Sequence, residues 1–331
     1  MKLSIIIKAL NEETNIARAI ESSLRAVEEV GGGEVILADS LSADGTIDIA
    51  RGYPIRIVQL THQEDRCCGI GAQLGFELAQ GDYVYILDGD MDLEPGFMAA
   101  AMACLEADPT LAGVGGQMRD MVLANEEFRK RAARSESHRQ PGIVDRLHGG
   151  GLFRHVALTQ VGYFTNQNLH AFEELELAAR LHAAGWRLAR LGLPAMRHYG
   201  HASTTYVLLW RRWHSKYLCG YGEILRQCWG KSHFGFVLRR LDDLRLFAAM
   251  ALWWCALAGV WVLPLPAFQQ ALLFLALLVF PFAVMVVRKG SLNAGVYSVV
   301  AWNFGILGLL RGLLLAPKGA PEAKLRSRVL Q

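Results

Sequence analysis

Apolar and polar residues alternate regularly over the first 90 residues of the chain. Short runs of Ile, Leu and Val have the length of buried strands, and the segments between them repeat apolar residues at helical spacing. The pattern predicts strands at 3–7, 34–38, 55–58 and 83–87 and helices at 16–30, 46–51 and 71–79. Strands that alternate with helices are typical of βαβ units, so we expect an α/β fold with a mostly parallel central sheet.

From Leu244 to Leu315 the chain is nearly uncharged and rich in Leu, Ala, Val, Phe and Trp. The apolar stretches at 246–263 and 268–287 are each long enough to span about 30 Å of hydrocarbon. A third stretch, 294–315, contains Asn303 and Arg311. This leaves two interpretations for it, a third span or a re-entrant or interfacial helix.

The pattern divides the chain into four regions. We expect an α/β domain at 1–203, interfacial amphipathic or linker helices at 204–243, a transmembrane region at 244–315 and a basic tail at 316–331. The linker interleaves aromatic and basic residues, which suits the headgroup layer of a membrane. Within the first region, residues 119–148 are polar and mixed in charge, as in a solvated helix or loop.

Basic residues and the N-terminus predict the orientation in the membrane. Arg245 precedes the first span and Arg288 and Lys289 follow the second, so the positive-inside rule places both flanks in the cytoplasm. The apolar run at 3–7 is shorter than the roughly 7–15 residues of a secretory signal. We therefore expect a multi-pass protein of the inner or plasma membrane whose α/β domain is cytoplasmic.

Composition narrows the classes of protein. Hydrophobic residues make up 52% of the 331, which excludes a disordered chain. The 34 basic and 31 acidic residues leave a net charge of only +3, so we expect no nucleic-acid partner. The six cysteines show no C-x-x-C spacing and are expected to be reduced thiols.

Polar side chains follow three of the predicted strands. Asn11 and Glu12 come after the first, Asp39 ends the second, and Asp88 and Asp90 come after the fourth. Such residues also punctuate ordinary turns. However, the carboxyl ends of parallel strands share one edge of a sheet, where ligands bind. Three such clusters at one edge favour a ligand site.

Several motifs occur in a fixed order along the first 200 residues. They are the strand and Asn-Glu turn at 4–13, the Asp-Ser-Leu-Ser-Ala-Asp-Gly-Thr loop at 39–46, the helix at 71–75, the Asp-Gly-Asp strand at 79–90, the Val-Gly-Tyr-Phe segment at 161–164 and the Glu-Glu-Leu-Glu-Leu-Ala-Ala-Arg helix at 172–185. Together they resemble the family 2 glycosyltransferases. The resemblance implies the GT-A nucleotide-sugar-binding fold, which is Rossmann-like, and transfer of a sugar from a nucleotide-diphosphate donor.

Two positions depart from the family pattern. The acidic pair at the acceptor site is Glu173-Glu174, so a glutamate replaces the usual aspartate. The motif Gln-x-x-Arg-Trp of processive members is present only as Leu209 to Trp213 and lacks its glutamine. The second departure weakens any case for synthesis of long polymers.

The resemblance assigns a divalent cation, Mg²⁺ or Mn²⁺, to the Asp88-Gly89-Asp90 motif. Two carboxylates one residue apart can hold a hard cation that binds the donor diphosphate, and Gly89 allows close approach. Asp90 is the expected direct ligand, and Asp88 is expected nearer the ribose. Asp92 competes for the metal role, and His198 is a further candidate ligand or a structural histidine.

Other residues are assigned to the donor nucleotide and the acceptor. Asn11, Glu12 and Asp39 are expected around the base and ribose of a UDP- or GDP-sugar. Glu174 is expected to be the general base that deprotonates the acceptor hydroxyl, with Glu173 as the alternative. A single displacement with one base inverts the anomeric configuration. Arg212 and Trp213 are expected on the acceptor side.

The predicted function is therefore a membrane-anchored, metal-dependent, inverting glycosyltransferase. Its acceptor is lipid-linked or a saccharide, as in cell-surface polysaccharide or glycolipid synthesis. One alternative is a polyisoprenyl-phosphate glycosyltransferase, whose phosphate acceptor needs less help from a base. An alternative of another class is a non-catalytic nucleotide-sugar-binding component of a polysaccharide assembly complex.

Overall fold

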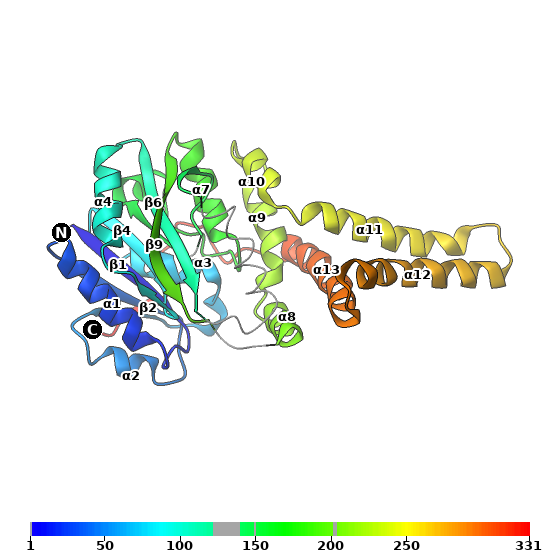
Figure 1. Cartoon of the computed structure of the whole chain (residues 1–331), viewed down its shortest axis with the longest axis horizontal. Coiled ribbons are helices and arrows are strands. Elements are labelled where there is room, and N and C mark those ends of the chain that lie inside the picture. The colour runs from blue at the N-terminus through cyan, green and yellow to red at the C-terminus, as the bar shows by residue number, and fades with distance from the viewer. Residues whose placement is uncertain (1, 122–139, 149, 201–203) are drawn as a thin grey trace.

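The computed structural model describes residues 2–121, 140–148, 150–200 and 204–331. It consists of an α/β head and a long helical extension that leaves the head on one side (Figure 1). Most of the polar stretch predicted at 119–148 lies outside the described residues.

The first half of the head contains the predicted βαβ units. The strands β1 (Leu3–Ala9), β2 (Gly33–Asp39), β3 (Arg56–Leu60) and β4 (Tyr83–Asp88) are parallel neighbours in the order β3-β2-β1-β4. The helices α1 (Ile16–Glu29), α2 (Thr46–Ala50) and α3 (Cys68–Phe76) connect them. The strands and helices predicted over this stretch are confirmed, and the strands end at one edge of the sheet.

The second half of the head makes the sheet mixed. It contributes β5 (Met91–Leu93), β6 (Leu111–Asp120), β7 (Gly142–Val144), β8 (Gly151–Arg154) and β9 (Arg187–His198). Strand β8 is antiparallel to β4 and β6, and β9 is parallel to β6 but antiparallel to β5 and β7. The expectation of a mostly parallel sheet therefore applies to the first half, because apolar runs indicate a strand but not its direction.

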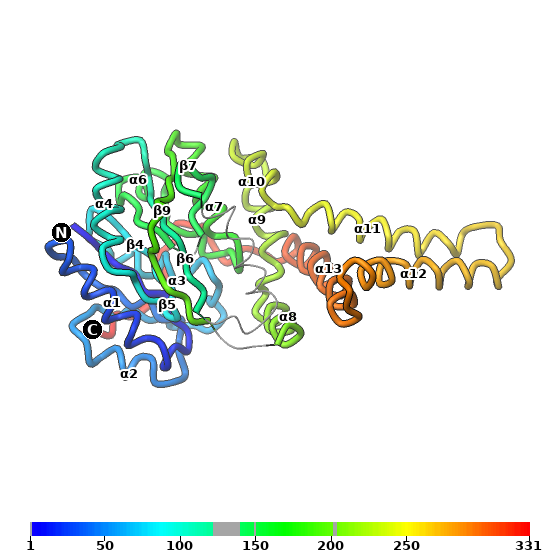
Figure 2. Tube along the Cα trace, in the orientation of Figure 1, coloured from blue at the N-terminus to red at the C-terminus, as the bar shows by residue number. Residues whose placement is uncertain are grey.

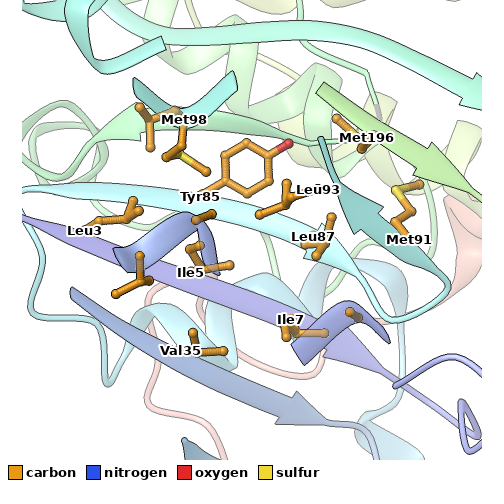
Figure 3. Packing of buried hydrophobic residues seen from close by; sticks show 14 of the residues in the cluster. Leu3, Ile5, Ile7, Val35, Tyr85, Leu87, Met91, Leu93, Met98 and Met196 are labelled. Carbon is orange, nitrogen blue, oxygen red and sulfur yellow. The ribbon is translucent and has the colours of Figure 1, made fainter. Parts of the chain in front are cut away.

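Helices cover both faces of this sheet. Alternate residues of β1 point to opposite faces, so Leu3, Ile5 and Ile7 pack in one apolar layer while Ile6 joins the other. The first layer includes Tyr85 and residues of α1 and α4 (Phe97–Ala107) (Figure 3). The second layer lies against α3, α6 (His155–Gln160) and α7 (Glu173–Ala183).

The linker region is helical and packs on the head. It contains α8 (Thr205–His214), the short η2 (Tyr217–Cys219), α9 (Gly220–Cys228) and α10 (Phe234–Arg240). Apolar residues of α9 and α10 share a buried cluster with Leu169 and with Leu175 and Ala179 of α7. The linker and the head therefore share a buried apolar cluster.

Three helices are long and apolar enough to cross a membrane. They span Leu244–Val262, Ala267–Lys289 and Leu292–Leu314. The first consists of α11 (Leu244–Gly259) and η3 (Val260–Val262), and the others are α12 and α13. Helices α11 and α12 form a hairpin that points away from the head, whereas α13 returns to α8 and α9 (Figure 2).

The basic tail returns to the head. Residues 327–329 form β10 (Ser327–Val329), which pairs antiparallel with β3 at the edge of the sheet. The Arg326 guanidinium lies 2.7 Å from an Asp65 carboxylate oxygen. The sequence predicted the tail only as a basic segment. A three-residue strand has too little periodicity to be predicted, and its pairing partner is remote in the chain.

Candidate active site

The predicted site residues gather at the carboxyl ends of β1, β2 and β4 and at the start of α7. Asn11 has a positive φ of 58°, and its amide oxygen accepts a hydrogen bond from the Ala43 N–H at 2.8 Å. The backbone carbonyl of Glu12 accepts from Ile16 N–H and so begins α1. Glu12 is buried, and a side chain at Gly89 would meet its Cγ at 2.9 Å. Gly89 therefore lets the β1 and β4 ends approach each other.

Asp39 is completely buried at the end of β2. Its carboxylate accepts hydrogen bonds from Gln59 Nε2 at 2.8 Å and from the Ser42 N–H at 3.0 Å. Arg66 donates to the carbonyl of Ser40 at 2.7 Å. In this structure Asp39 and Arg66 hold the loop after β2 in place.

Lys8 joins the two halves of the site and was not predicted from the sequence. Its Nζ lies 2.8 Å from Asp88 at the end of β4 and 4.0 Å from Glu173 at the start of α7. Burial alone would lower the pKa of Lys8, but the Asp88 and Glu173 carboxylates outweigh burial and raise it above its ordinary value. Lys8 is therefore an ammonium ion. Gly71 of α3 leaves space for its aliphatic stem, because a Cβ there would lie 3.0 Å from Lys8 Cγ.

Lys8 was missed because it was interpreted as the residue that ends the first apolar run. It belongs to β1, where it pairs in register with Ala38 and Asp88 of the neighbouring strands. A charged residue inside a strand that is otherwise buried was the available signal, since such residues are rarely buried unless they are paired.

Asp90 and His198 form a second group. His198 Nε2 lies 3.2 Å from the Asp90 carboxylate, and its Nδ1 lies 2.8 Å from Asp120. Because a carboxylate only accepts, Nδ1–H donates to Asp120, and Nε2 faces Asp90. Two acceptors this close need a proton or a metal ion between them. A carboxylate behind the imidazole commonly orients a histidine that binds a metal ion.

The predicted metal residues are brought together only in part. Asp90 and His198 are in contact, whereas Asp88 is paired with Lys8. Asp92, the competing candidate, is buried and bound to Arg197 at 2.9 Å. Within the described ranges, no group of three His, Cys, Asp or Glu side chains could hold a metal ion by itself. The pair fits a cation that also takes oxygen ligands from a bound phosphate.

Glu173 and Glu174 are the first residues of α7. They line a cavity together with Lys8, Asp88 and the hydroxyl-bearing Thr165. Its remaining lining is Ala72, Ile86, Leu147, Gly150, Phe153, Phe164, Leu177, Ala178 and Leu188. The carboxylates at the β4 end and at the α7 start thus share one small and mainly apolar space.

Arg212 and Trp213 lie on α8 and are absent from the lining of this cavity. The Arg212 guanidinium stacks on Tyr217, with 5.0 Å between its Cζ and the ring centroid. The Trp213 ring packs edge-on against Phe304 of α13 at 5.4 Å, and Arg311 also stacks on it. In this structure both residues therefore join α8 to its neighbours.

Comparison with known proteins identifies similar sequences. The sequence model of the family described as "Glycosyl transferase family 2" matches residues 4–161. "Putative glycosyltransferase EpsE" of Bacillus subtilis (strain 168) is 30% identical over 196 residues, which cover 56% of this chain and 68% of that protein. "Beta-monoglucosyldiacylglycerol synthase" of Trichormus variabilis is 25% identical over 255 residues, which cover 69% of this chain and 52% of that protein.

A solved structure shows the same fold. It is the mannosyltransferase PcManGT from Pyrobaculum calidifontis, described in complex with GDP-Man and Mn²⁺. The TM-score is 0.61 at 20% identity, and the match covers 95% of this chain and 87% of the other. The fold of the head is therefore GT-A-like, as the motifs predicted.

We expect Lys8→Met to lower the thermal unfolding midpoint at pH 7. The change leaves Asp88 and Glu173 without their shared cation, at a cost of about 1–3 kcal/mol for a partly buried pair. A raised pKa means that Lys8 stabilises the fold fully below its ordinary value of 10.5 and loses this effect only as the pH rises through the higher folded value. Lys2→Met, at an exposed position, is the control, and an equal midpoint for both variants would contradict the role given to Lys8.

Proposed function

As this chain belongs to glycosyl transferase family 2 and is a glycosyltransferase, we propose that it moves a sugar from a UDP- or GDP-sugar to a lipid-linked or saccharide acceptor in polysaccharide or glycolipid synthesis. One observation carries this proposal. Lys8 contacts both Asp88, which we assign to the donor, and Glu173, which we assign to the acceptor side. These residues line one cavity, which supports a shared site for donor and acceptor.

The charges of the cavity support a neutral acceptor. Asp88, Glu173 and Glu174 line it with a single ammonium, that of Lys8, among the described residues. An anionic acceptor such as a polyisoprenyl phosphate would enter against this excess of negative charge. A hydroxyl acceptor enters without that cost and gives a proton to a carboxylate.

Asp90 and His198 are the residues that we assign to a divalent cation, Mg²⁺ or Mn²⁺. When bound, the cation would neutralise charge on the departing nucleoside diphosphate. Asp120 orients the imidazole, and Gly89, which precedes Asp90, leaves space for the Glu12 side chain. The Pyrobaculum mannosyltransferase, which was solved with GDP-Man and Mn²⁺, supports this assignment.

We expect the full-length protein to release nucleotide from one of a panel of UDP- and GDP-sugars when Mn²⁺ and a membrane lipid extract are present. Asp90→Asn should abolish this release, because it removes a cation-binding oxygen. Titration calorimetry with UDP and GDP should show that Mn²⁺-dependent affinity falls in this variant. Unchanged Mn²⁺-dependent affinity would refute the role of Asp90.

Glu174 is our choice of general base. Glu174 stands at the position of the family's acceptor-side acid and lines the cavity, so we assign the proton of the attacking hydroxyl to it. Both carboxylates stand in the first turn of α7, where the helix dipole favours negative charge. A single displacement assisted by Glu174 inverts the configuration at the anomeric carbon.

We expect Glu174→Gln to lower kcat by about 10²- to 10⁴-fold, the usual worth of general-base catalysis. Donor affinity should stay unchanged, because the residue serves the acceptor. Glu174→Asp should keep part of the activity, since the carboxylate remains. Glu173→Gln is the matched control with a milder effect. The reverse ranking of the two glutamine variants would assign the base to Glu173.

The tail strand supports an even number of membrane crossings. The pairing of β10 with β3 favours a tail and a head on the same side of the membrane. Arg226 of α9 donates to the carbonyl of Gly312 near the end of α13 at 3.0 Å. We assign the two crossings to α11 and α12 and place α13 at the membrane surface beside the head, on the cytoplasmic side that Arg245 and Arg288 indicate.

Reporter fusions test this topology. Alkaline phosphatase inserted at the turn between α11 and α12, at residues 264–266, should be active, because it faces the far side. The same reporter fused after Gln331 should be inactive, while green fluorescent protein at that position should fluoresce. Active phosphatase after Gln331 would show that α13 crosses the membrane.

A further inference from the structure

The segment that leads into the catalytic helix is held by C-terminal parts of the chain. We call residues 168–172 the pre-helix segment. The Asn168 side chain donates to the carbonyl of Gly319 at 2.9 Å and accepts from the Lys318 N–H at 2.7 Å. Ala171 packs so closely on Gly220 of α9 that a Cβ there would lie 2.6 Å from the Ala171 Cβ. These contacts join parts of the chain that are far apart in sequence.

The central contact is a buried carboxylate on α9. Glu223 is 1% exposed, and it accepts two hydrogen bonds from His170, from the backbone N–H at 2.9 Å and from ring Nδ1 at 2.7 Å. One side chain therefore fixes both the backbone and the imidazole of His170. Hydrogen bonds to a buried charged group are among the more stabilising ones. Removing one partner leaves the other buried group without a hydrogen bond, which lowers the free energy of unfolding.

The residue that immediately precedes the catalytic pair has a strained conformation. Phe172 has a φ of 67°, a region that bulky residues rarely adopt. Its ring packs edge-on against Tyr221 of α9, with 4.6 Å between centroids. Such strain persists only where the surroundings hold it. Here α9 supplies those surroundings, and Glu173 and Glu174 follow directly.

Helix α9 is itself fixed to α13. A Cβ at Gly222 would lie 2.1 Å from the carbonyl oxygen of Leu309, and one at Gly312 would lie 2.0 Å from that of Cys219. Arg226 also donates to the carbonyl of Leu313 at 3.2 Å. The backbones of these two elements are therefore in direct contact, and α9 has little freedom to move without α13.

We propose that Glu223 is a positioning residue for sugar transfer. Through His170 it holds the pre-helix segment, and it thereby sets the direction in which Glu173 and Glu174 enter the cavity. The membrane-side helices then complete the catalytic site as well as anchoring it. This inference rests on the proposed function, because its kinetic test measures sugar transfer. Amide hydrogen exchange gives a second test that does not depend on that function.

The test uses the full-length protein in detergent micelles and the variant Glu223→Gln. We expect kcat for transfer to fall about tenfold or more, because small misplacement of a catalytic group is costly. The dissociation constant for the donor nucleotide should stay within about twofold, since the donor residues do not contact Glu223. Amide exchange over residues 168–176 should accelerate, while exchange in β1 and β4 stays unchanged.

Two further variants separate positioning from general stability. Glu34→Gln is the matched control, because Glu34 is also a shielded carboxylate, bound to Ser4 at 2.7 Å and Arg56 at 2.9 Å, but lies far from the pre-helix segment at the start of β2. It should keep kcat and the exchange of 168–176 unchanged. His170→Gln should reproduce the effect of Glu223→Gln, and the double variant should be no worse than either single one.

Each outcome supports or overturns the inference. Unchanged kcat and unchanged exchange over 168–176 in Glu223→Gln would overturn it, as would an equal loss of donor affinity and kcat. Equal effects of Glu34→Gln and Glu223→Gln would reduce the contact to a general stabilising one. If the unmodified protein released nucleotide from no donor, the proposed function would fail, and the exchange measurement would still test the Glu223 contact.

Discussion

The candidate active site depends on a lysine placed between carboxylates from two distant parts of the chain. Asp88 ends a strand of the parallel half of the sheet, and Glu173 begins a helix much later in the sequence. In a mainly apolar cavity, like charges at close range repel strongly. The ammonium of Lys8 lies within 4.0 Å of both and makes their proximity stable. The strand ends and α7 can therefore converge on one space.

The sequence predicted the parallel half of the head and the edge where the site lies. Helical and strand periodicity indicates the elements, and polar residues at strand ends indicate the edge. It did not predict Lys8, because one charge in an apolar run resembles the end of a strand. Arg212 and Trp213 match a family motif, but their positions depend on packing against Tyr217 and α13, respectively. Contacts between remote segments leave no local signal.

Composition divides the chain near residue 203, but the packing of side chains continues across this boundary. Leu175 and Ala179 of α7 share one buried cluster with Ile224 of α9 and Val237 of α10. Separating the two regions would expose this apolar surface to water, at a free-energy cost of about 25 cal/mol for each Å² exposed. The head and the helices α9 and α10 are therefore joined by a shared buried cluster.

The pairing of β10 with β3 has a consequence for the order of events during synthesis. Residues 327–329 follow all three apolar helices in the chain, so they emerge from the ribosome only after the hairpin has been made. Until then the outer edge of β3 presents unpaired backbone groups, which is a template for wrong association. Completion of the sheet thus awaits synthesis of the tail, and a nascent chain that stalls before its tail would carry an open sheet edge.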